Sequence, residues 1–302
     1  MTKIGIIGVG HVGSHIASAL MYNSLCSDLY LFDLNKDLLR AQRKDLEQGN
    51  MLSDVIVRIH EAEINDLLSC DIVINTASKQ ITDGDRVGEL KANKEIVKSI
   101  FSEFNEESFK GIIINVSNPC DVIACLIHKT TGIKPNRIIS TGTLLDSVRL
   151  KSAISEMYKI PAKDVKGLVI GEHGKTQVNA YSNTYIYNRP IKEYLSEYNE
   201  VLDEKELLHT ITRAGWDIFD VKRCTEFGIA GVTAYLIKQI LFNTGIVLPF
   251  SHMHYYDGKL IYISTPAFIG KSGFIKELPI KLSSNEEEAF NKSCEAMKNL
   301  IY

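Results

Sequence analysis

The sequence of 302 residues lacks the features that mark exported, membrane-embedded or nucleic-acid-binding proteins. Its six cysteines show neither a C-x-x-C pair nor metal-ligand spacing, so we expect reduced thiols, a cytoplasmic location and no metal. No apolar run approaches the roughly 18 residues that cross a bilayer, and no basic, apolar leader precedes the first expected strand. The net charge of −3 gives no electrostatic reason for binding nucleic acid. We therefore expect a globular protein whose partners are small molecules or copies of itself.

The first half of the chain alternates short β-rich segments with helical stretches. Most of these segments are almost continuously apolar, as expected for parallel strands that helices cover on both faces. The alternation predicts an α/β fold with a Rossmann-type doubly wound parallel sheet. We expect six strands, over residues 4–7, 29–32, 55–59, 71–75, 111–116 and 137–140.

The pattern changes after Gly142, where we expect a mixed α+β second domain. Asp257-Gly258 lies between two aliphatic and aromatic runs and predicts a two-residue hairpin turn. Ser283 or Ser284 can cap the last helix. These features predict a first domain over 1–141 and a second over 142–302. In the second domain we expect helices near 144–158, 204–216 and 227–242, and strands near 165–170.

A glycine-rich loop follows the first expected strand. In Gly8-Val9-Gly10-His11-Val12-Gly13, the glycines predict a tight turn, a close backbone approach to a pyrophosphate, and close packing of the next helix. That helix would bind the phosphates at its N-terminus. Asp33 lies twenty residues after Gly13 and would accept hydrogen bonds from ribose hydroxyls, which favours NAD over NADP. The alternative for Asp33 is a surface residue at the end of a strand.

An acid/base pair and an arginine follow in the second half. His173 comes directly after an apolar strand, and its imidazole can donate a proton to a forming alkoxide and take it back in reverse. Asp146 and Arg149 share one helix face, so one turn can present an acid to the histidine and a guanidinium to a substrate carboxylate. The alternative for the last two is an ordinary surface ion pair.

Two further polar segments are candidates for the site. Arg86 ends a polar, glycine-containing stretch, which predicts a loop that closes over the substrate and polarises its carbonyl; a solvated connection is the alternative. Asn118 precedes Pro119, and it is either a turn former or a donor to the substrate oxygen.

In order and spacing, these motifs resemble the NAD-dependent L-lactate and malate dehydrogenase superfamily, over essentially the whole chain. The resemblance implies that His173 is the acid/base, Asp146 orients it, Arg149 binds the carboxylate and Arg86 is the lid arginine. It also implies that Asn118 contacts substrate and cofactor and that Thr225 lines the substrate pocket. Further NAD contacts are implied for Val12, Ala77, Ser78, Ser99, Val116 and Thr141.

The residue type at the position of Gln80 distinguishes members of this superfamily by their substrate. Malate dehydrogenases carry arginine at its position and lactate-type enzymes glutamine, so the resemblance implies a monocarboxylic 2-oxo acid, with pyruvate and L-lactate first. L-2-Hydroxyisocaproate dehydrogenase, which acts on bulkier acids, is the alternative, and malate dehydrogenase follows. The resemblance also implies a homodimer or homotetramer. Lys151 and Lys166 stand where activated bacterial relatives bind fructose 1,6-bisphosphate, and Ser78 replaces the usual glycine.

Two other classes of protein fit the sequence less well. An NAD-dependent glycosidase would need a metal site and a longer chain. A redox sensor or structural protein on the same fold would be expected to have lost His173 or Arg149, and both are present.

Overall fold

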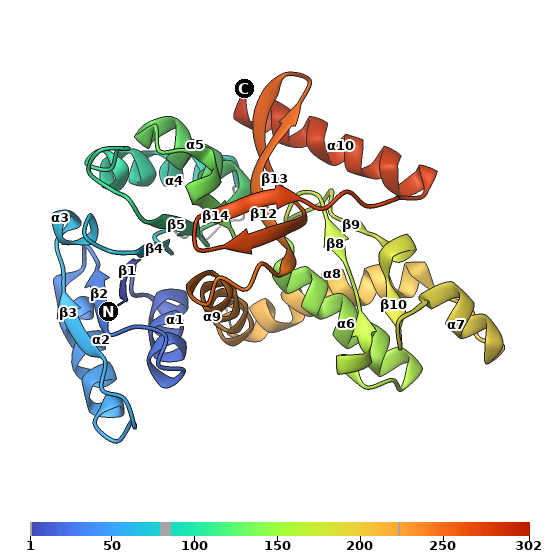
Figure 1. Cartoon of the computed structure of the whole chain (residues 1–302), viewed down its shortest axis with the longest axis horizontal. Coiled ribbons are helices and arrows are strands. Elements are labelled where there is room, and N and C mark those ends of the chain that lie inside the picture. The colour runs from blue at the N-terminus through green and yellow to red at the C-terminus, as the bar shows by residue number, and fades with distance from the viewer. Residues whose placement is uncertain (1, 79–85, 223) are drawn as a thin grey trace.

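The fold is built on one nine-stranded sheet, shown in the computed structural model of Figure 1. The structure describes residues 2–78, 86–222 and 224–302, and the side chains of all of these except 86–91, 212, 216 and 219. The strands follow the order β14-β13-β12-β6-β5-β4-β1-β2-β3. The six parallel strands are β1 (Lys3–Ile7), β2 (Asp28–Phe32), β3 (Arg58–Glu61), β4 (Ile72–Asn75), β5 (Ile112–Asn115) and β6 (Ile138–Ser140). Their order 3-2-1-4-5-6 confirms the Rossmann-type doubly wound sheet.

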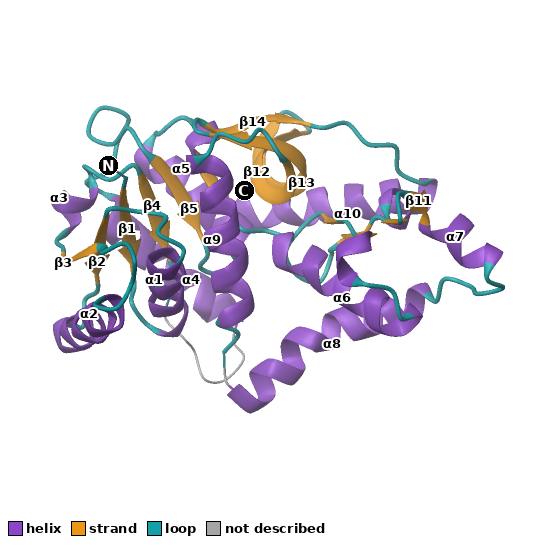
Figure 2. Cartoon of the chain, turned by 60° about the horizontal axis from the view of Figure 1, so that its bottom comes forward, coloured by secondary structure: helices purple, strands orange, loops and turns teal. Residues whose placement is uncertain are grey.

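Helices cover both faces of this sheet because its strands carry apolar residues on both sides (Figure 2). One apolar cluster joins the sheet to α1 (His11–Tyr22), α2 (Lys36–Asn50) and α9 (Phe227–Leu241). A second joins the opposite face to α3 (Ile64–Leu67), α4 (Arg86–Phe101) and α5 (Cys120–Thr131). The crossing point of the strand order, between β1 and β4, therefore lies where a dinucleotide cleft is expected.

The second half of the chain extends the sheet and adds a separate core. The antiparallel strands β12 (Val247–Tyr256), β13 (Lys259–Gly270) and β14 (Gly273–Glu277) join the parallel strands where Ser251 pairs with Ser140. α10 (Ser284–Ile301) packs on β13 and α5. The separate apolar core is formed by α6 (Leu144–Tyr158), β7 (Val165–Lys166), β8 (Val169–Ile170), β10 (Tyr185–Ile186), α7 (Ile191–Glu197) and α8 (Glu204–Lys222), with β9 (Val178–Asn179) and β11 (Arg189–Pro190) as short partner strands.

Several sequence predictions about elements are confirmed. The helix over 144–158 has the predicted bounds, and α10 begins with a capping box in which Ser283 and Glu286 bond each other's backbone N–H groups. The hairpin turn is also present, since Asp257 and Gly258 have φ angles of 47° and 70°. Both angles are positive, as a type I′ turn requires.

Other predicted bounds were wrong for local reasons. The strand expected over 55–59 begins only at Arg58, because the Asn50 side chain donates to the Val57 carbonyl and accepts from its N–H, which holds a turn there. The strand expected over 165–170 is two short strands in different sheets. The helix expected to end at residue 216 continues to Lys222.

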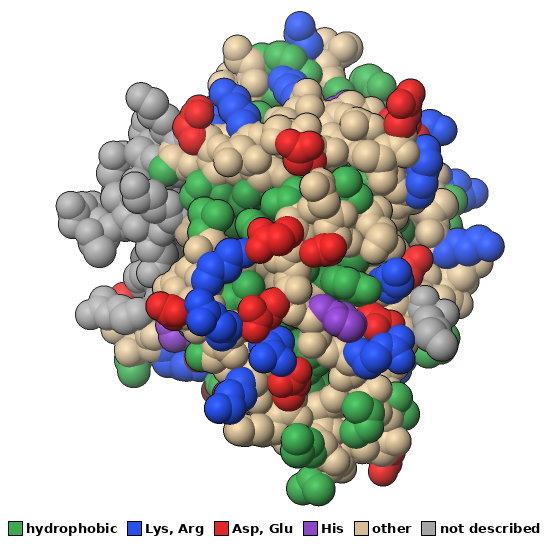
Figure 3. All heavy atoms as spheres, turned by 90° about the vertical axis from the view of Figure 1, so that its left-hand side faces the viewer, with side chains coloured by type: hydrophobic (Ala, Val, Ile, Leu, Met, Phe, Trp, Pro, Cys, Tyr) green, Lys and Arg blue, Asp and Glu red, His purple; other side chains and the backbone are tan. Residues whose placement is uncertain are grey.

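Ion pairs cover the open edge of the sheet at β3. Arg43 on α2 pairs with Glu61, Lys36 with Glu63, and Arg58 with the buried Asp28. Figure 3 shows this side of the molecule, where acidic and basic side chains interleave rather than form a field of one sign. Charged side chains protect an edge strand from pairing with another chain. Among the described helices, none is both long and apolar enough to cross a membrane.

Candidate active site

The glycine-rich loop forms one wall of a groove at the end of β1. Gly8 has a φ of +87°, and a Cβ on Gly13 would lie 1.9 Å from the Gly8 carbonyl oxygen, so α1 approaches the loop as only glycine allows. A Cβ on Gly10 would meet nothing within 4 Å. The loop backbone is therefore open to a ligand beside the N-terminus of α1, where free N–H groups and the helix dipole favour phosphate.

Asp33 is fixed at the end of β2 by two backbone hydrogen bonds. Its carboxylate accepts from the N–H of Val9 at 2.8 Å and from that of Asn35 at 2.8 Å. Each carboxylate oxygen keeps a further lone pair, so the group can still accept from ribose hydroxyls.

The groove has a volume of about 390 Å³. A dinucleotide fits the geometry of the loop, the acid and the helix N-terminus together. The predicted cofactor residues that line it are Gly8, Gly10, Val12, Gly13, Asp33, Ala77 and Ser78. The other predicted cofactor residues, Ser99, Val116, Asn118 and Thr141, do not belong to the described lining.

Asp146, His173 and Arg149 form a connected cluster. The Nδ1 atom of His173 lies 2.6 Å from an Asp146 carboxylate oxygen, and the Nη1 atom of Arg149 donates to the other oxygen at 2.9 Å. The Asp146 side chain is 4% exposed, and those of Arg149 and His173 are 18% and 27% exposed. A buried carboxylate that binds Nδ1 of the imidazole leaves Nε2 available for proton transfer.

Hydrogen bonds between α6 and β8 bring this cluster together. The Thr143 hydroxyl donates to the Val169 carbonyl at 2.6 Å, and the Val169 N–H donates to the Ser147 hydroxyl at 2.9 Å. Asp146 lies between these two anchors in the first turn of α6, where the helix dipole stabilises an anion. The chain then turns at Gly171, whose φ is +91°, and delivers His173 to the carboxylate.

The electrostatics of the pair favour the charged forms. Burial acts to lower the pKa of His173, but the charge and hydrogen bond of Asp146 outweigh it and raise the pKa above its usual value. Burial likewise acts to raise the pKa of Asp146, and the charges of His173 and Arg149 outweigh it and lower that pKa. The imidazole is therefore held ready to carry a proton near neutral pH.

Asp121 is a second acid beside His173 that the sequence reasoning missed. It lies in the first turn of α5, is 2% exposed, and one of its oxygens accepts from the backbone N–H of His173 at 2.9 Å. Burial raises the pKa of Asp121 to about 6. Its position next to Ser117-Asn118-Pro119, at the end of a buried strand, is the sequence signal that could have found it.

A second cavity, of about 430 Å³, lies between α6, α8 and the start of α9. Arg149 and Thr225, two of the predicted substrate residues, both line it, with apolar neighbours that include Leu145, Val148 and Ile218. This volume is in the usual range of small-molecule sites. His173 and Asn118 are not in its described lining; His173 is linked to it through Asp146 and Arg149.

The remaining predicted residues lie outside the linings of the groove and the cavity or outside the described part of the chain. Asn118 is exposed at the end of β5, and its carbonyl accepts from the Asn93 side chain at 2.9 Å. Lys166 donates to the Asn188 side chain, and burial lowers the pKa of Lys151. Gln80 and the side chain of Arg86 lie outside the described residues, although the backbone of residue 86 begins α4.

A doubly wound sheet with a groove that fits a dinucleotide, together with a cluster of a buried carboxylate, a histidine and an arginine, is typical of a nicotinamide-dependent dehydrogenase. Comparisons with known proteins agree. The family model of the lactate/malate dehydrogenase NAD-binding domain matches residues 2–140, and that of the lactate/malate dehydrogenase alpha/beta C-terminal domain matches residues 143–302. The chain belongs to the lactate/malate dehydrogenase family.

Individual relatives match over nearly their whole length. The chain is 32% identical to an L-lactate dehydrogenase of Fusobacterium nucleatum subsp. nucleatum, covering 99% of this chain and 96% of the relative. It is 34% identical to an L-lactate dehydrogenase of Clostridium botulinum (strain Loch Maree / Type A3), with the same coverage. Among solved structures, the minor L-lactate dehydrogenase of Enterococcus mundtii matches with a TM-score of 0.92 and 28% identity, over 99% of this chain and 97% of that one.

A lactate dehydrogenase from a deep-sea metagenome library of the Medee basin matches with a TM-score of 0.93 and 28% identity, over 99% of this chain and 98% of that one. The predicted cofactor is confirmed as NAD, and the chain is an NAD-dependent 2-hydroxy acid dehydrogenase.

Proposed function

We propose that this enzyme interconverts pyruvate and L-lactate, with His173 as the acid/base. The cluster of His173, Asp146 and Arg149 carries the proposal, because it joins a proton donor, its orienting carboxylate and a guanidinium within hydrogen-bond distance. NAD, when bound, supplies or accepts the hydride. Reduction takes the proton from the imidazole, and Asp146 stabilises the imidazolium before that transfer.

Arg149 binds the substrate carboxylate in this proposal. Its guanidinium lies on the wall of the 430 Å³ cavity, and one of its nitrogens already donates to Asp146, so the side chain is held while other N–H groups stay available. A planar guanidinium matches a carboxylate through two parallel bonds. Arg86 would polarise the substrate carbonyl, while Asn118 and Thr225 would contact the substrate from the remaining sides.

The choice of a monocarboxylic acid is supported by sequence and by the similar proteins. Gln80 offers an amide where a second carboxylate would need a positive partner. The named relatives are L-lactate dehydrogenases. We further propose that residues 1–141 bind NAD and residues 142–302 carry the substrate site, and that the enzyme works in the cytoplasm as a homodimer or homotetramer.

The substitution His173→Asn tests the catalytic assignment. We expect turnover of pyruvate to fall by about 10² to 10⁴, because the proton path is lost. The affinity for NADH, measured by fluorescence titration, should stay within about twofold of the unmodified enzyme. His209→Asn, at an exposed position in α8, is the matched control and should keep normal turnover. Near-normal turnover in His173→Asn would refute the assignment.

A further inference from the structure

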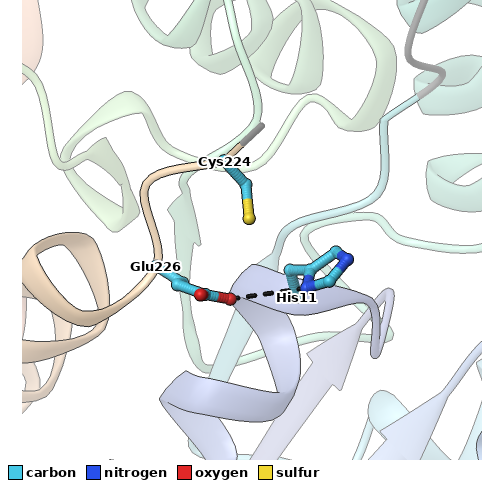
Figure 4. Close-up of side chains that lie close together, drawn as sticks. All are labelled: His11, Cys224 and Glu226. Atoms are coloured by element: carbon cyan, nitrogen blue, oxygen red, sulfur yellow. Dashed lines mark ion pairs between the residues drawn. The ribbon is translucent and has the colours of Figure 1, made fainter. Parts of the chain in front are cut away.

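Three side chains with no role in the proposed reaction meet where the cofactor groove and the 430 Å³ cavity approach each other: His11 and Cys224 line the groove, and Glu226 lines the cavity. His11 begins α1, and Cys224 and Glu226 lie between α8 and α9. Each offers a metal-binding atom, and these atoms all lie within 4.8 Å of one another. Figure 4 shows the Cys224 sulfur and the Glu226 carboxylate directed toward the imidazole of His11. His11 and Cys224 are far apart in the sequence, so no motif of closely spaced ligand residues predicts the cluster.

The distances suit a tetrahedral ion. Zinc binds nitrogen, oxygen and sulfur at about 2.0 to 2.3 Å, so two ligand atoms on one tetrahedral ion are about 3.4 to 3.6 Å apart. The Nδ1 atom of His11 already lies 3.4 Å from Oε2 of Glu226. The ligand atoms, which lie at most 4.8 Å apart, therefore need to close by about 1.4 Å at most, and rotation about the Cα–Cβ bond of Cys224 moves its sulfur over such a distance.

The surroundings hold the carboxylate and leave the thiol accessible. Lys222 donates to Oε1 of Glu226 at 2.6 Å, which orients the group and leaves Oε2 between the imidazoles of His11 and His15, at 3.4 and 3.5 Å from their Nδ1 atoms. Cys224 is partly exposed, whereas the other five cysteines are buried.

We propose that His11, Cys224 and Glu226 bind one zinc-type divalent cation, and that this cation and NADH exclude each other. His11 directly follows Gly10 in the phosphate-binding loop, and both His11 and Cys224 line the cofactor groove. A cation that draws the Cys224 sulfur toward His11 joins two walls of that groove beside the loop. It would narrow the opening that the cofactor pyrophosphate needs.

Cobalt(II) is the probe for this site, because thiolate-bound Co²⁺ has a charge-transfer band in the near ultraviolet. Cofactor-free protein should develop this band with about one equivalent of Co²⁺, and Zn²⁺ should remove it. Cys224→Ser should abolish the band, and Glu226→Gln should weaken Co²⁺ binding about tenfold or more. His209→Gln, a substitution of an exposed histidine in α8, should leave the spectrum unchanged.

Saturating NADH should suppress the band, and Zn²⁺ should inhibit competitively against NADH. Absence of the band, or a band that survives in Cys224→Ser, would overturn the site. A band that persists at saturating NADH would overturn the exclusion. Circular dichroism checks that each variant folds. Should Cys224→Ser fail to fold, alkylation of the one partly exposed thiol with iodoacetamide must remove the band instead.

Discussion

Replacing Asp146 with asparagine removes the charge that holds His173 in its protonated form while it keeps the shape of the side chain. The lost carboxylate oxygen lies 2.6 Å from Nδ1 of His173. Two opposite charges about 4 Å apart interact by about 4 kcal/mol at an effective dielectric constant of about 20. A neighbouring charge of this kind shifts a pKa by about one to three pH units, or about 1.4 to 4 kcal/mol.

The sign of the effect follows from the direction of the pKa shift. Asp146 raises the pKa of His173, so its removal lowers that pKa, and burial is left to disfavour the imidazolium. Reduction of pyruvate needs the protonated ring. The alkaline limb of the pH profile of kcat/KM should therefore move toward acid by about one to three pH units. The loss of orientation should also lower kcat/KM by about 10 to 10³ at neutral pH, less than for His173→Asn.

The assay is pyruvate reduction at saturating NADH, followed through NADH absorbance from pH 5 to 10. Asp217→Asn is the matched control, since it removes an exposed carboxylate on α8. It should leave the alkaline limb in place. If Asp146→Asn keeps the alkaline limb of the unmodified enzyme, Asp146 does not set the protonation of His173, and the electrostatic reasoning is refuted.

Asp33→Ser should narrow the preference for NADH over NADPH, because it removes the anion that would repel a 2′-phosphate; an unchanged ratio of kcat/KM for the two cofactors would contradict this. Gly13→Ala should lower the stability by about 1 to 3 kcal/mol and weaken NADH binding, because its methyl group would lie 1.9 Å from the Gly8 carbonyl oxygen. Gly231→Ala, in α9 with nothing within 4 Å, is the control in thermal unfolding and should be neutral or stabilising.

The local parts of the fold could be predicted from the sequence because the signals are local. The nearly continuous apolar runs of β1 and β4 need only a count of neighbouring residues, and the bounds of α6 follow from the change of pattern after Gly142. The start of β3 could not be predicted in this way. Val57 is a residue type that favours strands. The side chain of Asn50, seven positions earlier, forms hydrogen bonds with the N–H and carbonyl of Val57, and the strand begins only after it.

Long-range pairing explains the other differences. The sequence predicts the antiparallel strands near the hairpin but not their neighbour: β12 continues the parallel sheet, with Ser251 paired to Ser140. The pattern of apolar residues in β12 or in β6 does not specify which strand lies next to it in the sheet. The same limit applies to Asp121, whose contact with the backbone of His173 joins positions 52 apart in the chain.

The chemistry of the site was easier to predict than its extent. Asp146 and Arg149 are three residues apart on α6, so their shared face follows from helical geometry alone. Their meeting with His173 depends on the anchors of α6 on β8, which involve Thr143 and Ser147 and carry no motif. The cluster at Glu226 lies still further from any sequence signal, since α1 packs directly on α9 only in the folded chain, where the ring of His15 contacts that of Phe227.

The most direct test of the proposed function is a steady-state comparison of 2-oxo acids with NADH. The measurement is kcat/KM of the unmodified enzyme for pyruvate, 4-methyl-2-oxopentanoate and oxaloacetate. We predict the highest value for pyruvate and the lowest for oxaloacetate, whose second carboxylate finds an amide at Gln80 rather than a positive charge. A preference for oxaloacetate, or a strong preference for 4-methyl-2-oxopentanoate over pyruvate, would contradict the proposed function.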